Sequence, residues 1–419
     1  MLKFTSPAPT NSEIGKSKNK TEGAIRAFKK QYPEEVEAIN LAYKEDHYSF
    51  IKAEEFIKIK NSDEILNNTF KDEDFEKELN KIIDDIENKR IPGTIYTDGN
   101  NSKHAYITPI NDEILGVKSM LEDENINLPI VISIGNHKGG ANKTTNTTNI
   151  AASLAYFGFK TLIVDFDPQG NASGSFGLYE NDYKNTIIDL IAMSTDEDIE
   201  EKIRKSILNI NLDGKFENEI TGRLDIIPNN ATMSEKVEDL PTMSRSLGTI
   251  ENTLSRVLNY IKNDYDFILI DLPPRTDVIL RTAMMASDYF VISLNAQPFA
   301  KMGMPNILNP MKKYEHVYKQ EKYKDFVILG GIVGCYEKGI NIQDINYEQM
   351  KHDILECTNE KSSLFETVIA KSTIVQESQQ GDGAVLFTAP CNKIVRNFFD
   401  LTLEIIERVI INQMSTKEQ

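Results

Sequence analysis

A glycine-rich segment, residues 137–145, stands between an apolar run at 131–134 and a helix-like run that begins at Thr144. Glycines let the backbone turn tightly and aim N–H groups at an anion, and the N-terminus of the following helix adds the positive end of its dipole. Lys143 adds a point charge, and the hydroxyl of Thr144 can hold Mg²⁺. The segment therefore predicts a phosphate-binding loop between a strand and a helix.

The general Walker A pattern, G-x-x-x-x-G-K-[ST], is not matched, because Asn142 stands where that pattern has its second glycine. A second lysine, Lys138, directly precedes the glycine pair. The segment K-G-G-A-N-K-T-T from Lys138 onward resembles the deviant Walker A signature of the ParA and MinD-like ATPases, K-G-G-x-x-K-T-T.

Further motifs of that family follow in the family's order over roughly two thirds of the chain. Residues 160–172, K-T-L-I-V-D-F-D-P-Q-G-N-A, resemble the segment after the first helix. Residues 265–274, Y-D-F-I-L-I-D-L-P-P, resemble the Walker B strand. Smaller similarities lie at 224–228 and at 287–298. The resemblance implies a P-loop ATPase fold.

Local patterns agree with that fold, because apolar strands alternate with helical segments after residue 128. We expect a doubly wound, mostly parallel sheet that carries the phosphate loop at its C-terminal edge. A last amphipathic helix at 401–411 has little excess of positive charge, so we expect it to pack in the core rather than on a membrane. The predicted strands are 129–134, 161–165, 223–227, 266–271, 289–294 and 326–334, and the predicted helices are 144–157, 245–262 and 277–286.

Two domains are predicted: residues 1–127, and an ATPase domain at 128–419. The first has amphipathic segments followed by two strand-like runs around the turn residues 98–103. Helices followed by a hairpin suggest a winged helix-turn-helix, and the larger plasmid-type ParA proteins carry such a DNA-binding domain. A helical dimerisation or docking domain is the alternative. The predicted helices are 21–45, broken at Pro33, then 49–60, 72–89 and a connecting helix at 111–127.

The composition places limits on compartment and cofactors. No stretch reaches the ~18 apolar residues of a membrane span, and residues 1–20 are polar rather than signal-like. We expect a cytoplasmic protein that associates with the nucleoid. Cys335, Cys357 and Cys391 show no C-x-x-C spacing, so they are expected to be small apolar residues rather than disulfide or cluster ligands.

The resemblance assigns ATP or ADP and Mg²⁺ to the loop. Lys143 and the loop backbone would hold the β- and γ-phosphates, and Thr145 the α-phosphate. Thr144 and the Walker B acid Asp271 would hold Mg²⁺. The nucleotide-contacting residues implied are Lys138, Gly139, Gly140, Ala141, Asn142, Lys143, Thr144, Thr145 and Pro273.

Three further roles concern hydrolysis, which requires a positioned water and neutralised phosphate oxygens. Asp167 is the family position that orients the water. Asp165, taken as lying on the same strand face, is expected to be structural or an outer-shell magnesium partner. In the family, the lysine at the position of Lys138 reaches the ATP of the other subunit of a dimer; the alternative is a solvated loop cation.

DNA contacts are predicted from weaker signals, because the net charge is −17 and phosphate contacts need local basic residues. Residues 368–378 resemble a DNA-contacting stretch of small ParA proteins, in which Lys371 keeps the first positive charge and Ile374 replaces the second. Lys393 and Arg396 fall near another such position. Each could equally be an ordinary surface cation.

The function implied is that of a ParA-type partition ATPase of a plasmid. It would form an ATP-dependent homodimer, bind nonspecific DNA, respond to a ParB-like centromere-binding protein and repress its own operon. Two alternatives are a nucleotide-switched transcriptional repressor without a transport role and a MinD-like spatial regulator. No membrane partner is expected.

Overall fold

The computed structural model describes residues 93–97, 103–107, 117–118, 121, 124–136, 138–212, 222–230, 249–274, 278–296, 303–322, 325–336, 341–358, 361–389 and 392–417. The chain divides into two compact units, and each is described by itself. The first comprises Met1–Ile110, Phe216–Asn218 and Pro390–Arg396, and the second comprises the remaining residues.

In the first unit, β1 (Gly93–Thr97) and β2 (Lys103–Ile107) form an antiparallel pair. The strand pair predicted around residues 98–103 is therefore present. The helices predicted at 21–45, 49–60 and 72–89, and most of 111–127, lie outside the described residues. The winged helix-turn-helix and the boundary between residues 127 and 128 stay predictions.

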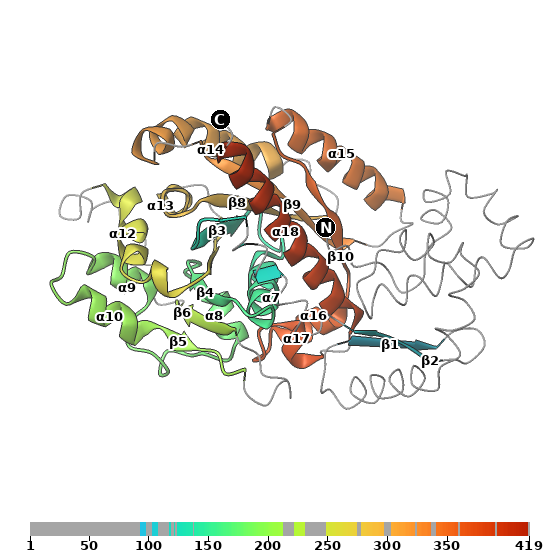
Figure 1. The fold of residues 1–419 in the computed structure, drawn as a ribbon, viewed down its shortest axis with the longest axis horizontal. Helices are drawn as coiled ribbons and strands as arrows, with labels where there is room; N and C mark the ends of the chain where they lie inside the picture. Colours follow the sequence, from blue (N-terminus) through green and yellow to red (C-terminus); the bar gives the residue numbers. More distant parts are fainter. Residues whose placement is uncertain are drawn as a thin grey trace, which may run out of the picture. The chain divides into compact units, whose positions relative to one another are not determined.

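The second unit is built on a mostly parallel eight-stranded sheet, in the order β10-β9-β8-β3-β7-β4-β6-β5 (Figure 1). The short β5 pairs antiparallel with β6, while the other pairs are parallel. Residues of β3, β7 and β8 are buried throughout, as expected for parallel strands covered on both faces. The predicted α/β class is confirmed. The strands are β3 (Ile130–Gly135), β4 (Lys160–Asp165), β5 (Leu208–Asn209), β6 (Arg223–Ile227), β7 (Phe267–Asp271), β8 (Tyr289–Asn295), β9 (Val327–Tyr336) and β10 (Leu364–Ala370).

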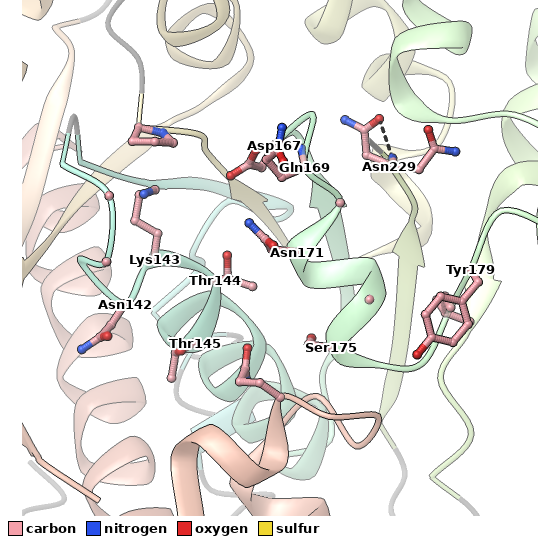
Figure 2. Close-up of a pocket in the computed structure, with 18 of the residues that line it drawn as sticks. Asn142, Lys143, Thr144, Thr145, Asp167, Gln169, Asn171, Ser175, Tyr179 and Asn229 are labelled. Atoms are coloured by element: carbon pink, nitrogen blue, oxygen red, sulfur yellow. Dashed lines mark hydrogen bonds between the residues drawn. The ribbon is translucent and has the colours of Figure 1, made fainter. Parts of the chain in front are cut away.

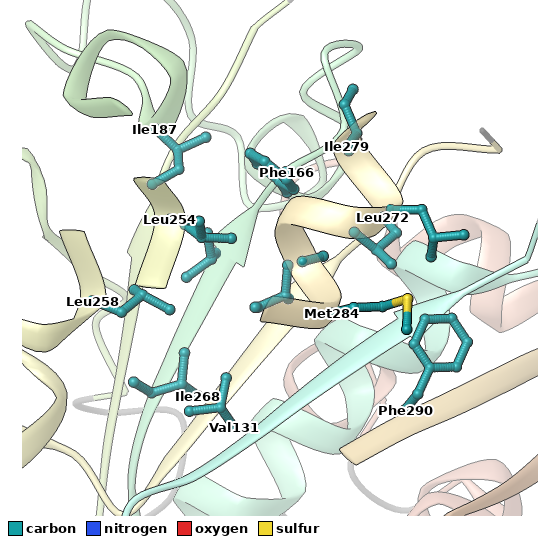
Figure 3. Close-up of a cluster of buried hydrophobic side chains, with 14 of the residues drawn as sticks. Val131, Phe166, Ile187, Leu254, Leu258, Ile268, Leu272, Ile279, Met284 and Phe290 are labelled. Atoms are coloured by element: carbon teal, nitrogen blue, oxygen red, sulfur yellow. The ribbon is translucent and has the colours of Figure 1, made fainter. Parts of the chain in front are cut away.

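Helices cover both faces of this sheet. Figure 3 shows Val131, Ile268 and Phe290 of three strands packed against Leu254 and Met284 of two helices on one face. The helices of the second unit are α7 (Lys143–Tyr156), α8 (Asn171–Ser175), α9 (Ile187–Ala192), α10 (Ile199–Ser206), α12 (Thr253–Asn259), α13 (Val278–Ala286), α14 (Gly303–Lys322), α15 (Asn341–Cys357), α16 (Thr373–Ser378), α17 (Val385–Thr388) and most of α18 (Lys393–Lys417).

The C-terminal helix α18 packs against the sheet and α7. Phe399 of α18 stacks on Tyr156 of α7 with a centroid distance of 5.2 Å. Arg408 of α18 donates hydrogen bonds to the carbonyl oxygens of Leu329, Ser363 and Leu364 beside β9 and β10. Core packing of this helix is confirmed, although it is longer than the predicted 401–411. None of the described helices combines the length and apolar character needed to cross a membrane.

Several elements differ from the pattern-based expectation. The helix predicted at 245–262 is broken into a 3₁₀ turn at Ile250–Asn252, then α12, then a second 3₁₀ turn at Lys262–Asp264, with residues 245–248 outside the described part. The elements β5, β10, α14 and α15 were not predicted. β10 mixes exposed and buried residues at the sheet edge, and α14 contains Pro310, so neither shows a clean period in sequence.

Candidate functional site

The loop between β3 and α7 adopts left-handed backbone at two positions. Gly140 has φ 71°, and Asn142, directly before α7, has φ 57°. Glycine reaches this region without steric cost, and Asn is among the few other residues that visit it routinely. Asn142 therefore keeps the conformation that the general Walker A pattern obtains with glycine.

Two side chains of strand β8 donate hydrogen bonds to the backbone of the phosphate loop. Asn295 Nδ2 donates to the carbonyl oxygen of Gly140 at 3.2 Å, and Ser293 Oγ donates to the carbonyl oxygen of Ala141. In a trans peptide the C=O and the next N–H point in opposite directions. The N–H groups of residues 141 and 142 therefore point away from β8 and are available to an anion.

The two signature lysines have different surroundings. Lys143 is only 7% exposed, and its Nζ donates to the carbonyl oxygen of Lys138 at 3.4 Å. Burial lowers the pKa of Lys143, while Asp271 and Asp167 act to raise it. Among the described residues, none forms an ion pair or hydrogen bond with the Lys138 ammonium. Lys143 therefore contacts the backbone of the phosphate loop, whereas the Lys138 ammonium makes no such contact with the described residues.

Thr144 and Asp271 meet where α7 begins and β7 ends. Thr144 Oγ1 donates to Asp271 Oδ2 at 2.7 Å, and Thr147 Oγ1 donates to Asp271 Oδ1 at 3.1 Å. Burial, reinforced by Asp167, raises the pKa of Asp271 to about 7, although the threonines and Lys143 oppose the shift. The Thr144 hydroxyl and the Asp271 carboxylate therefore lie side by side next to the phosphate loop.

Asp165 and Asp167 occupy different settings. β4 ends at Asp165, so Asp167 lies two residues beyond the strand and does not share its face, which corrects the prediction. Asp165 Oδ2 accepts from the backbone N–H of Ser173 at 2.8 Å and from its hydroxyl at 2.7 Å. Burial, and then Asp271, raise the pKa of Asp165 to about 8. Asp167 Oδ1 accepts from the N–H of Gln169 at 2.9 Å.

The loop, the start of α7 and the segment after β4 surround one cavity of about 920 Å³ (Figure 2). Of the predicted residues, Gly139, Gly140, Ala141, Asn142, Lys143, Thr144, Thr145 and Asp167 line it. Asp271 lies beneath Thr144, and Lys138 and Pro273 are outside the lining, whereas Pro274 belongs to it. Figure 2 shows Lys143, Thr144 and Asp167 around the cavity and Tyr179 at its far end.

Sequence reasoning missed other residues of the site. Gln169 and Asn171 line the cavity and belong to the recognised D-x-D-P-Q-G-N-A segment, which was the available signal. Gln379 reaches the cavity from the loop after α16, and Asn295 holds the phosphate loop from β8. Asn295 belongs to the similar segment at 287–298, which was its signal, whereas Gln379 lies just beyond the segment 368–378 and only the fold brings it to the cavity.

The predicted DNA contacts are divided between the two units. Lys371 is exposed directly after β10, and its N–H donates to the carbonyl oxygen of Tyr336 at 3.4 Å. Lys393 and Arg396 begin α18 in the first unit, and the Lys393 side chain lies outside the described residues. No common surface is therefore assigned to the three.

A glycine-rich loop between the first strand and helix of a parallel sheet, with a strand-terminal carboxylate beside the first threonine of the helix, defines a P-loop ATPase. A family model described as an AAA domain matches residues 130–323. The chain is 28% identical over 276 residues to the sporulation initiation inhibitor protein Soj of Bacillus subtilis, covering 66% of this chain and 97% of Soj. It is 32% identical over 223 residues to the uncharacterized protein MJECL24 of Methanocaldococcus jannaschii, covering 53% of this chain and 79% of that protein.

Relatives named chromosome partitioning protein ParA, from Myxococcus xanthus and Caulobacter vibrioides, match a similar part of the chain. The solved structure of apo McdA from Cyanothece superposes with a TM-score of 0.51 at 18% identity, covering 66% of this chain and 98% of McdA, which supports the fold alone. The chain belongs to the ParA/Soj/MinD family of deviant Walker A ATPases.

Proposed function

We propose that this protein is a partition ATPase that binds ATP, dimerises around it and uses the dimer to hold DNA. The observation that supports this most directly is the convergence of Lys143, the Thr144–Asp271 pair and Asp167 on one cavity at the N-terminus of α7. The ParA-type motifs and the relatives named ParA favour partition over other uses of the same fold.

The phosphates would lie against residues 139–145. The N–H groups that point away from β8 and the N-terminus of α7 suit an anion, and Lys143 adds a positive charge close to it. Thr145 would contact the α-phosphate. The cavity accommodates the rest of a nucleotide, with Pro274 in its wall rather than the predicted Pro273.

The donor set beneath the loop fits Mg²⁺. Mg²⁺ prefers hard oxygen ligands and usually takes only one or two from protein side chains, with waters and phosphate oxygens as the rest. Thr144 offers a hydroxyl and Asp271 a carboxylate, and burial raises the pKa of Asp271 although Lys143 opposes the shift. When bound, the cation would neutralise phosphate charge.

Hydrolysis would depend on two further side chains. Asp167 lines the cavity and lies outside the strand, so its carboxylate can orient a water toward the terminal phosphate. Lys138 would supply positive charge to the nucleotide of the second subunit, as an arginine finger does. Its lack of an ion-pair partner among the described residues supports a role in trans.

The finer parts of the proposal come from the family resemblance. They are action in the cytoplasm on the nucleoid, plasmid origin, stimulation by a ParB-like protein, operator binding through residues 1–127 and nonspecific DNA contacts through Lys371, Lys393 and Arg396. The exposure of Lys371 is compatible with such a contact. The high negative net charge means that DNA binding should need several copies acting together.

Light scattering with and without ATP and Mg²⁺ tests the proposal. The wild-type protein should double in mass with ATP. Lys138→Ala should still bind a fluorescent ATP analogue but stay monomeric, because its cation acts on the other subunit's nucleotide. A wild-type protein whose mass does not respond to ATP would refute the dimer, and loss of ATP binding in Lys138→Ala would refute the assignment in trans.

A further inference from the structure

Two residues with left-handed backbone in the second unit, Asn142 and Cys335, are in direct contact. Among the described residues, non-glycine residues with positive φ are Asn125, Asn142 and Cys335. Asn142 lies directly before Lys143 in the phosphate loop, and Cys335, with φ 53°, lies near the end of β9. The Asn142 amide Nδ2 donates to Cys335 Sγ at 3.1 Å.

The end of β9 leaves room for that amide. A Cβ added at Gly334 would come to 2.7 Å from Asn142 Nδ2, so any side chain at that position would displace the amide. Cys335 is itself in a conformation that residues with a Cβ seldom adopt. Such positions persist only where the surroundings hold them, and they concentrate at functional sites.

We propose that Cys335 is a positioning residue for nucleotide binding, acting through Asn142. The general pattern places glycine before the lysine, because glycine adopts positive φ freely. Here an asparagine occupies that position, and the thiol of Cys335 holds its amide so that the left-handed turn is populated before the nucleotide arrives. Ser293 and Asn295 of β8 bind the two carbonyl oxygens that precede Asn142 in the loop. Cys335 of β9 adds a third contact, to the Asn142 side chain.

This inference rests on the proposed ATP binding. If the turn is less populated, the apparent affinity falls in proportion, because only the turned loop is competent to bind. Cys335→Ala removes the acceptor but keeps a Cβ at the strained position. Losing one hydrogen bond of this kind should weaken ATP binding by about threefold to tenfold. The KM should rise by the same factor, and kcat should change less, because the contact acts equally on bound substrate and transition state.

Cys335→Ser is the conservative variant, since its hydroxyl can still accept from the amide, and it should keep most of the affinity. Gly334→Ala, which displaces the amide instead of removing its partner, should weaken binding as Cys335→Ala does. Cys357→Ala is the matched control. Cys357 is the other described free thiol, packs against the core from α15 and does not line the cavity, so its loss should leave the affinity unchanged.

The decisive experiment is a double-mutant cycle measured by equilibrium binding of a fluorescent ATP analogue to the full-length protein. In the Asn142→Gly background the turn no longer needs the thiol, so adding Cys335→Ala should change the affinity by less than twofold, whatever the affinity of Asn142→Gly alone. An equal loss in both backgrounds would overturn the inference, as would a Cys335→Ser variant as weak as Cys335→Ala. A wild-type protein that does not bind the analogue would refute the proposed function itself.

Discussion

At the scale of single residues, three aspartates at one edge of the sheet have distinct environments. Asp165 and Asp271 lie opposite each other in the register of β4 and β7, and both are fully buried. Burial is the main cause of the raised pKa of each, with a further contribution from Asp271 at Asp165 and from Asp167 at Asp271. Asp165 binds Ser173 and holds α8, Asp271 binds Thr144, and only Asp167 lines the cavity.

Because Asp167 lines the cavity, we expect that its loss reduces hydrolysis without reducing ATP binding. Asp167→Ala should lower kcat by about 100-fold or more, because it removes the group that orients the water, while ATP affinity and ATP-dependent dimerisation remain. Steady-state phosphate release and equilibrium nucleotide binding measure the two effects. Lys143→Ala is the contrasting variant, since it should lose ATP binding itself. Turnover at the wild-type rate in Asp167→Ala would remove this residue from the mechanism.

At the scale of elements, the segment after Asp167 is joined to the loop between α16 and α17. Gly381 N donates to the carbonyl oxygen of Ser175 at 2.9 Å, at the end of α8. Gly383 has φ 78°, and a Cβ added there would come to 2.1 Å from the ring of Phe176. Gln379, in the same loop, lines the cavity. The loop therefore braces α8, the helix that follows Asp167.

A side chain at Gly383 should disturb catalysis at a distance. Gly383→Ala must push Phe176 away and with it the end of α8, and such displacements can cost on the order of 10- to 100-fold in kcat. Replacing Phe176 by Ala as well should restore most of the rate. Gly381→Ala is the control, because it also has positive φ but its Cβ would meet nothing within 4 Å. If both alanine variants lose the same activity, backbone strain rather than the Phe176 contact is responsible. Phosphate-release rates at saturating ATP measure the effect.

At the scale of the whole molecule, an acidic chain must present basic residues locally to hold DNA. The net charge is −17. The candidates Lys371, Lys393 and Arg396 follow the predicted winged domain in sequence, although Lys393 and Arg396 belong to the first unit. Binding to phosphates releases counterions and depends steeply on salt, whereas sequence preference needs contacts to bases. Two separate DNA-binding activities are therefore expected.

Separate variants should divide these activities. Substituting Lys371 and Lys393 by Ala should weaken ATP-dependent binding to any duplex and reduce the salt slope by about one unit for each lost contact, while operator preference remains. Deleting residues 1–127 should abolish operator preference and spare nonspecific binding. Fluorescence anisotropy on operator and random duplexes at several salt concentrations distinguishes them. If the deletion also loses nonspecific binding, residues 1–127 are better interpreted as a dimerisation module.

Much of the ATPase unit is determined by sequence, because its signals are local. The apolar runs of β3, β4, β7 and β8 are buried on both faces, so continuous hydrophobicity alone predicts them, and the phosphate loop follows from glycines next to a helix start. The edge strand β10 was not predicted, and the helix predicted at 245–262 is interrupted on both sides of α12, because contacts with neighbouring elements rather than local periodicity determine both features.

The contacts between distant residues of the site could not be predicted without the tertiary structure. Asn142 read as a defect in the motif until its φ of 57° and the thiol of Cys335, 193 positions away, showed how its turn is held. Asp165 and Asp167 were expected on the same strand face, and the end of β4 at Asp165 separates them. Local chemistry determined which residues can bind phosphate and Mg²⁺. Only the parallel sheet decided which carboxylate lines the cavity and which strand anchors the loop, because contacts between distant segments are set by strand order and register.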